Sequence, residues 1–144
     1  GTFGAAALVV SLVGRAALLA RIGPALGPLV VTGALARLGA VMLLTSMPYA
    51  TPEGSRSRDL ARGGAPQAAV AILHGALVAA AAVLFGAVSP VRLGAGVLTC
   101  GLVVALAGAR FAARAGGVTG DFLGAAEQLG ELALLGAFAW GAGP

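Results

Sequence analysis

Five long apolar stretches, separated by short polar or glycine- and proline-rich segments, make up most of this 144-residue sequence. They cover residues 5–20, 26–47, 67–88, 93–109 and 122–140. A helix needs about 20 apolar residues to cross the hydrocarbon core of a bilayer, and most of the stretches approach that length. The first and fourth are short enough for re-entrant elements unless flanking residues extend them. We therefore expect an all-α fold, a polytopic transmembrane helical bundle of about five spans, in one membrane-embedded domain over residues 1–144.

The composition agrees with a chain that is dissolved in lipid. Hydrophobic residues make up 59% and charged residues only 10% of the sequence, whereas soluble domains carry about 25% charged residues. All nine basic residues are arginine, and the formal net charge is +4. These arginines lack the basic face with interleaved aromatic residues that nucleic-acid-binding domains present. We therefore expect the lipid bilayer, and no nucleic acid, as a partner.

The connections between the stretches differ in length and charge. Those at residues 23–27 and 89–91 are tight turns that contain proline, whereas those at 48–66 and 110–119 are longer. The longer ones carry Arg56, Arg58, Arg62, Arg110 and Arg114, against Arg21 and Arg92 at the turns. Alternation of five spans puts both long connections on one side of the membrane, and the positive-inside rule makes that side cytoplasmic. The two charged loops can therefore build one site.

The strongest local signal is the segment over residues 116–131, which holds three of the five acidic residues. On a helix, Asp121 and Glu131 fall within an arc of about 80° and Glu127 lies about 40° further round, so the carboxylates project from one stripe. Mg²⁺ prefers oxygen ligands and typically uses one or two carboxylates together with phosphate oxygens. The stripe is suited to such a site. A capped helix with interfacial acids is the alternative.

Glycine residues precede this stripe and keep the backbone accessible. With Gly116, Gly117 and Gly120, main-chain amides and the start of the helix can approach a phosphate group closely. Thr119 is a suitable residue to cap that helix. The segment therefore predicts a phosphate site at the beginning of the last span.

Four charged or titratable side chains outside this segment also matter. Arg56 and Arg58 carry guanidinium groups that can pair with phosphate oxygens, or equally hold the loop at anionic headgroups. Arg37 lies near the middle of a span and needs a charge partner, for which we expect Glu131. His74 lies inside the third span, where a lone histidine is more often a hydrogen-bonded interior residue than a ligand.

The sequence over residues 116–127, Gly-Gly-Val-Thr-Gly-Asp-Phe-Leu-Gly-Ala-Ala-Glu, followed by Glu131, closely resembles a motif of cobalamin synthase. That family is also called adenosylcobinamide-GDP ribazoletransferase. Two further segments are similar to family motifs and stand in the family's order. They are Gly-Thr-Phe-Gly at residues 1–4, and Pro-Tyr-Ala at 48–50 with Pro-Glu-Gly at 52–54.

The resemblance implies a reaction and a location. The family joins adenosylcobinamide-GDP to alpha-ribazole or its 5'-phosphate, releasing GMP and forming adenosylcobalamin or its phosphate, the nucleotide-loop step of cobalamin biosynthesis. Its members are magnesium-dependent transferases of the cell inner membrane, and phosphoryl transfer calls mainly for positioning and charge neutralisation. Thr51 departs from the pattern, because the family usually has arginine there. The family's amino-terminal part should precede residue 1, so we expect the C-terminal portion of a longer enzyme that need not be active alone.

Carried over to this sequence, the resemblance implies three groups of site residues. The catalytic and metal-binding carboxylates are Asp121, Glu127 and Glu131. The substrate- and phosphate-binding residues are Gly116, Gly117, Thr119, Gly120, Arg114, Arg56 and Arg58. The general base is one of the carboxylates or an aspartate in the part that precedes residue 1.

A membrane transporter subunit is the main alternative. In it, Arg37, Glu131 and the glycine-rich start of the last span would form a substrate or proton path. No internal repeat supports that interpretation, and the aspartate pattern of CDP-alcohol phosphotransferases is not found in the sequence. A purely structural subunit would leave residues 116–131 unexplained. Besides the two substrates and the bilayer, the partners that stay open are other corrinoid-assembly enzymes and a second copy of the chain.

Overall fold

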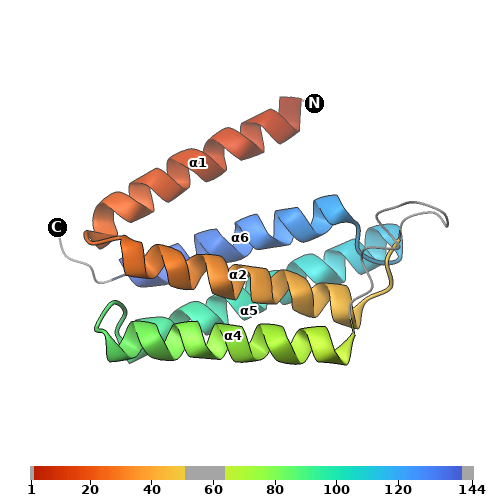
Figure 1. The fold of residues 1–144 in the computed structure, drawn as a ribbon. Helices are drawn as coiled ribbons and strands as arrows, with labels where there is room; N and C mark the ends of the chain where they lie inside the picture. Colours follow the sequence, from red (N-terminus) through yellow and green to blue (C-terminus); the bar gives the residue numbers. More distant parts are fainter. Residues whose placement is uncertain (1, 51–63, 141–144) are drawn as a thin grey trace.

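A computed structural model describes residues 2–50 and 64–140 of the chain. Within these residues five α-helices follow one another, and the β pairing consists of one isolated bridge. The helices are α1 (Thr2–Ile22), α2 (Leu26–Ser46), α4 (Ala65–Leu84), α5 (Pro90–Ala115) and α6 (Gly120–Ala139) (Figure 1). All five are long and apolar enough to cross a membrane. The chain is therefore an all-α, multi-pass membrane protein, as the sequence predicted.

Two helices are longer than their apolar stretches. α1 has 21 residues and α5 has 26, so both are long enough to span the bilayer. α5 continues through Arg110 and Arg114 to Ala115, and the loop that we expected over residues 110–119 is confined to 116–119. The prediction was wrong there because arginine and alanine are good helix formers. The helix stops only where Gly116 adopts a left-handed conformation (φ 70°), the usual role of glycine after a helix.

The third span also differs from its predicted bounds. α4 ends at Leu84, and the turn to α5 occupies residues 85–89 instead of 89–91. Gly86 takes a positive φ of 69° in this turn. Pro90 then begins α5, and the Ser89 hydroxyl caps it by accepting a hydrogen bond from the Arg92 amide at 3.4 Å. Proline suits the first helical position because its missing N–H has no helical partner there.

The core lies where α2, α5 and α6 meet. α6 packs against α1, α2 and α5, whereas α4 packs against α2. Leu134 and Phe138 of α6 are almost fully buried, as are Val31 and Ala36 of α2. Gly130 of α6 permits the close approach, because an added Cβ would lie 3.1 Å from the sulfur of Cys100 and 3.7 Å from Ala36. Small residues thus bring three backbones together, which is how membrane helices associate.

Two features of the arrangement position the candidate site. The segment after α2 and the segment between α5 and α6 lie at the same end of the bundle (Figure 1). α1 contacts α6 near its own C-terminal half and leans away from the other helices toward its N-terminus (Figure 1). The bundle therefore has one end where two loops meet and one open side between α1 and α6.

Candidate active site

Two segments far apart in the sequence are joined by backbone hydrogen bonds at this end of the bundle. Tyr49, after α2, and Val118, between α5 and α6, form the isolated parallel bridge. The Ala50 amide donates to the Val118 carbonyl at 2.8 Å, and the Val118 amide donates to the Pro48 carbonyl at 2.9 Å. The side chain of Val118 is fully buried. The two motif-bearing loops are thus in direct contact, which their predicted placement on one side of the membrane allowed.

Gly117 makes this pairing possible. A Cβ at this position would lie 2.1 Å from the carbonyl oxygen of Pro48, a separation that no pair of non-bonded atoms tolerates. Gly117 is buried by its own chain, so it holds the loops together, whereas the sequence suggested contact with a phosphate. The Tyr49 hydroxyl approaches the start of α6, 3.4 Å from the place of a Cβ on Gly120. Gly117 is therefore the glycine that the contact between the two loops requires, whereas a Cβ on Gly120 would make an ordinary van der Waals contact.

The start of α6 is fixed by a cap and a ring contact. Thr119 is the N-cap, as predicted, and its hydroxyl accepts a hydrogen bond from the Phe122 amide at 3.3 Å. The Phe122 ring stacks on Phe111 of α5 with ring centroids 4.4 Å apart. Gly120 and Asp121 follow the cap and are exposed. The first amides of a helix lack intrahelical acceptors and attract anions, so this exposed turn can bind a phosphate oxygen.

The three candidate carboxylates do not gather at this turn. Glu131 forms an ion pair with Arg15 of α1, and Glu127 forms one with Arg37 of α2, where Nε lies 3.3 Å from Oε1. The expectation that Glu131 is the partner of Arg37 was therefore wrong. α6 packs between α1 and α2, so the 40° between positions 127 and 131 is enough to direct the two side chains to different neighbours.

A hydrogen-bond network extends the first of these pairs. Gln128 of α6 accepts hydrogen bonds through its side-chain oxygen from Arg15 at 2.5 Å and from Ser11 at 3.5 Å. The sequence interpretation did not single out Arg15 or Ser11. The sequence could have indicated a partner for Arg15, since an arginine inside an apolar span needs a partner as much as Arg37 does. It could not have indicated one for Ser11, because a single hydroxyl in a membrane helix can form a hydrogen bond with its own backbone.

The carboxylates can be tested for their fit to magnesium. Over residues 2–50 and 64–140, no group of three or more His, Cys, Asp and Glu side chains could hold a metal ion. Asp121 is about 9 Å from Glu127 and about 15 Å from Glu131 along the helix axis, at 1.5 Å per residue. Both glutamates already face arginines. The three therefore do not fit one Mg²⁺, whereas Asp121, exposed at the loop end, fits as a single carboxylate ligand beside phosphate oxygens.

The candidate arginines lie in two places. Arg114 is exposed in the last turn of α5, two residues before Gly116, at the loop end of the bundle. A cation is favourable there because the carbonyl end of the helix dipole is negative. Arg56 and Arg58 lie outside the described residues. His74, to which the sequence assigned no role, is exposed on α4.

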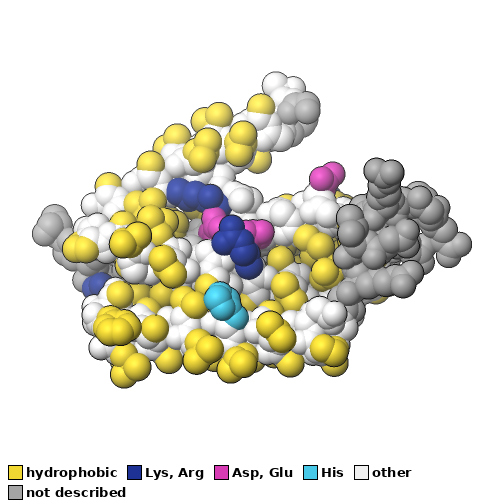
Figure 2. Space-filling view, viewed as in Figure 1, with side chains coloured by type: hydrophobic (Ala, Val, Ile, Leu, Met, Phe, Trp, Pro, Cys, Tyr) yellow, Lys and Arg dark blue, Asp and Glu magenta, His cyan; other side chains and the backbone are white. Residues whose placement is uncertain are grey.

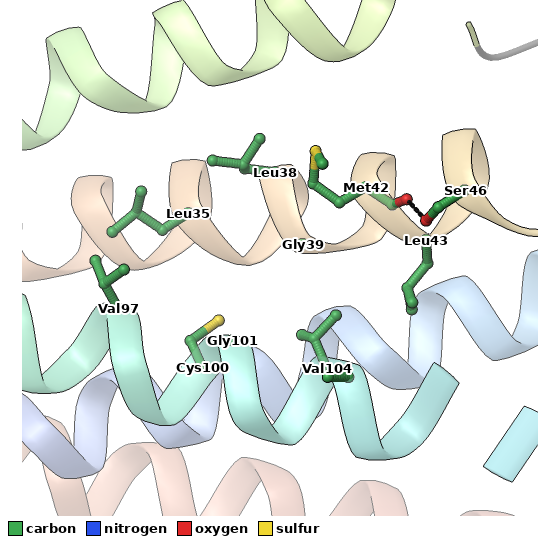
Figure 3. Close-up of a pocket in the computed structure, with 11 residues that line it drawn as sticks. Leu35, Leu38, Gly39, Met42, Leu43, Ser46, Val97, Cys100, Gly101 and Val104 are labelled. Carbon is green, nitrogen blue, oxygen red and sulfur yellow. Dashed lines mark hydrogen bonds between the residues drawn. The ribbon is translucent and has the colours of Figure 1, made fainter. Parts of the chain in front are cut away.

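A pocket of about 320 Å³ lies between α2 and α5 (Figure 3). Leu35 and Leu43 of α2 face Val97 and Val104 of α5 across it (Figure 3). Among the residues that the structure describes, no charged side chain lines the pocket, and Arg37 lies on the opposite face of α2, about 200° round from Leu35. An apolar pocket of this kind suits a hydrocarbon group and cannot neutralise a pyrophosphate.

Comparisons with known proteins identify the family. The family model described as cobalamin-5-phosphate synthase matches residues 1–139. The chain belongs to the cobalamin-5-phosphate synthase family. It is 39% identical over 149 residues to the adenosylcobinamide-GDP ribazoletransferase of Sinorhizobium medicae (strain WSM419). It is 38% identical over 144 residues to the protein of the same name from Azorhizobium caulinodans (strain ORS 571).

The matches also show what fraction of each relative's length the chain covers. They cover 96% and 94% of this chain, but 55% and 52% of the two relatives. The chain therefore spans about half the length of the curated relatives that it matches. No solved structure matches it. The cobalamin-5-phosphate synthase membership that the motifs predicted is confirmed, and two of those motif segments are the ones that the backbone pairing joins.

Replacing Gly117 with alanine should separate the two loops. The added methyl group overlaps the Pro48 carbonyl oxygen, so the loops must move, and overpacking of this kind costs about 1–3 kcal/mol. We expect a lower unfolding midpoint in detergent for Gly117→Ala. Gly124→Ala is the matched control, because a Cβ there meets nothing within 4 Å. Equal midpoints for the two variants would contradict the assigned role of Gly117.

A charge exchange tests the pairing of Arg37. Arg37→Glu alone places two carboxylates together and should lower the fraction of folded protein in membranes. The double variant Arg37→Glu/Glu127→Arg should recover most of that loss, because the pair at 3.3 Å is restored in reverse. Arg37→Glu/Glu131→Arg should recover nothing. Recovery by the second double variant and not by the first would show that Glu131 is the partner after all.

Proposed function

We propose that this chain contributes the phosphoryl-transfer site of an adenosylcobinamide-GDP ribazoletransferase. A hydroxyl oxygen of alpha-ribazole, or of its 5'-phosphate, bonds to the phosphorus on the cobinamide side of adenosylcobinamide-GDP. The pyrophosphate bond breaks, GMP leaves, and the hydroxyl proton passes to a base. The product is adenosylcobalamin or its phosphate. The family membership and the names of both relatives support this assignment.

The observation that carries the proposal is the pairing of residues 48–50 with Val118. It joins two family motifs that are separated by two helices, at the place where α6 begins. The exposed first turn of α6 offers amide donors and a positive dipole end to a pyrophosphate. Arg114 adds a guanidinium group at the same end of the bundle. A doubly esterified pyrophosphate needs these two things, donors of fixed direction and positive charge.

Asp121 is the carboxylate that we assign to this chemistry. It is exposed in the first turn of α6, where it can hold Mg²⁺ or accept the ribazole proton. Bound magnesium would neutralise charge on the pyrophosphate oxygens. Glu127 and Glu131 lie deeper along α6 in ion pairs with Arg37 and Arg15, so we assign them to holding α1, α2 and α6 together. Arg56 and Arg58 stay candidates for further phosphate contacts.

The same proposal places the protein in the cell inner membrane with its loop end in the cytoplasm. In the sequence, residues 48–66 and 110–119 hold five arginines, whereas Arg21 and Arg92 stand at the other two connections. Short loops with excess arginine stay on the cytoplasmic side during insertion. The cytoplasm is also where a nucleotide-activated substrate such as adenosylcobinamide-GDP would meet the site.

GMP release from adenosylcobinamide-GDP, with alpha-ribazole and Mg²⁺, tests the assignment of Asp121. The membrane-embedded chain is assayed beside the Sinorhizobium medicae relative, and each substitution is made in the chain and at the aligned position of the relative. Asp121→Asn should lower GMP release at least about 100-fold, the usual effect of removing a group that stabilises developing charge, while insertion is unchanged. Chelation of Mg²⁺ should stop release by the unsubstituted proteins.

Glu127→Gln is the matched control. It removes a carboxylate of the same helix that lies in an ion pair, so the yield of folded protein should fall while release per folded molecule stays within a few-fold. Asp121→Asn protein that releases GMP at the unsubstituted rate would remove Asp121 from the mechanism. If the relative releases GMP and this chain does not, the reaction also needs the part of the relative that this chain does not match.

A further inference from the structure

Polar side chains form a belt across one face of the bundle at mid-membrane depth. We define the belt as Arg15, Glu131, Glu127, Arg37 and His74. Arg37 is the twelfth of 21 residues in α2, His74 the tenth of 20 in α4, and the two glutamates the eighth and twelfth of 20 in α6. Figure 2 shows basic, acidic and histidine side chains close together over α1, α2, α6 and α4, surrounded by hydrophobic surface.

Arg37 is the exposed member of the ion pairs in this belt. Its side chain is 67% exposed, whereas Glu127 is 25% and Glu131 14% exposed. Its Nε faces Glu127, and Nη1 donates one hydrogen to the Gly33 carbonyl at 3.2 Å. A guanidinium group has five N–H donors, so three of them have no acceptor within the part of the chain that the structure describes. Both ends of α2 are roughly 13–17 Å away at 1.5 Å per residue, too far for the side chain to reach water.

Lipid tails offer no hydrogen-bond acceptors, so they cannot pair with the N–H donors of Arg37. An arginine inside a membrane therefore faces the interior of a bundle, a water-filled cavity or a partner. Water is also unfavourable, because the α1 wall of the opening is apolar. Leu8 lies two turns before Arg15 on the same face of α1, and Leu12 about 60° round from Arg15. Both leucines are more than half exposed. The missing cover must therefore be apolar along α1 and polar opposite Arg37.

A helix satisfies both requirements, because its apolar side chains can cover α1 while one polar side chain meets Arg37. We propose that the open side between α1 and α6 is the docking surface for a further membrane-spanning helix that carries a carboxylate near its middle. Charge decides the chemistry of that side chain. The two glutamates of the belt are mostly covered, whereas the side chain of Arg37 is exposed, so the belt presents positive charge and hydrogen-bond donors at Arg37. α1 inclines away from the other helices toward its N-terminus (Figure 1), and the space-filling view shows an opening between α1 and the rest of the bundle (Figure 2).

The probe for this surface is a synthetic membrane-spanning peptide of about 22 residues, built from leucine and alanine, with glutamate at its centre. The comparison peptides carry leucine or lysine at that position. The sequence has no lysine, so an amine-reactive dye labels the purified chain at its N-terminus. Energy transfer to a dye on the peptide then reports association in vesicles of phosphatidylcholine and phosphatidylglycerol.

We expect the glutamate peptide to associate about tenfold more tightly than the leucine peptide, the gain from one or two kcal/mol of polar contact in a membrane. Arg37→Gln should abolish that preference. Val30→Trp should weaken association while leaving the ion pair intact, since Val30 is exposed and lies two turns before Arg37 on the same face. Arg110→Gln, an exposed arginine of α5 outside the belt, is the control and should change nothing.

Three results would overturn the proposal. The first is equal association of the glutamate and leucine peptides. The second is a glutamate preference that persists in the Arg37→Gln protein, or association of the peptide that is undiminished in the Val30→Trp protein. The third is energy transfer between two differently labelled populations of the chain that is lost in the Arg37→Gln protein, which would assign this face to a second copy.

Discussion

The geometry of the loop end depends on the hydrogen bonds that two connecting segments make with each other, and on Val118, whose side chain is buried in the core. In this chain the amides of Ala50 and Val118 supply those bonds, and the bare backbone of Gly117 allows them. The pairing connects the end of α2 to the start of α6, across the whole of α4 and α5 in sequence. The Thr119 cap and the Phe111–Phe122 contact then direct the first turn of α6. The exposed amides and Asp121 are positioned by this one junction.

The second constraint comes from the bilayer, which offers no hydrogen bonds to a polar group. It explains why the two glutamates inside α6 each meet an arginine from a different helix. These pairs connect α6 to α1 and to α2 at mid-span, whereas small residues such as Gly130 bring α6 against α5 and α2. α6 therefore supplies both the proposed site, at its first turn, and the centre of the bundle.

Much of this could be predicted from the sequence, for identifiable reasons. Five spans follow from the lengths of the apolar stretches, and the placement of both loops at one end of the bundle follows from the alternation of spans. The cap at Thr119 follows from residue type. The partner of Arg37 could not be predicted, because positions 127 and 131 differ by only 40° and the choice depends on which helices flank α6. The end of α5 was missed because two arginines resemble a loop until Gly116 is seen to be the first residue that stops the helix. Gly117 was assigned to a phosphate because a sequence does not show which backbone approaches it.

Amide hydrogen exchange of the membrane-embedded protein, with and without adenosylcobinamide-GDP, tests the central claim most directly. The account predicts that the amides of Ala50 and Val118 are protected together in the free protein, although both lie in connecting segments. It also predicts that the substrate slows exchange at the first amides of α6, next to Asp121. Rapid exchange of Val118 in the free protein would contradict the loop pairing. Protected loops with no change at the start of α6 on substrate addition would contradict the location of the site.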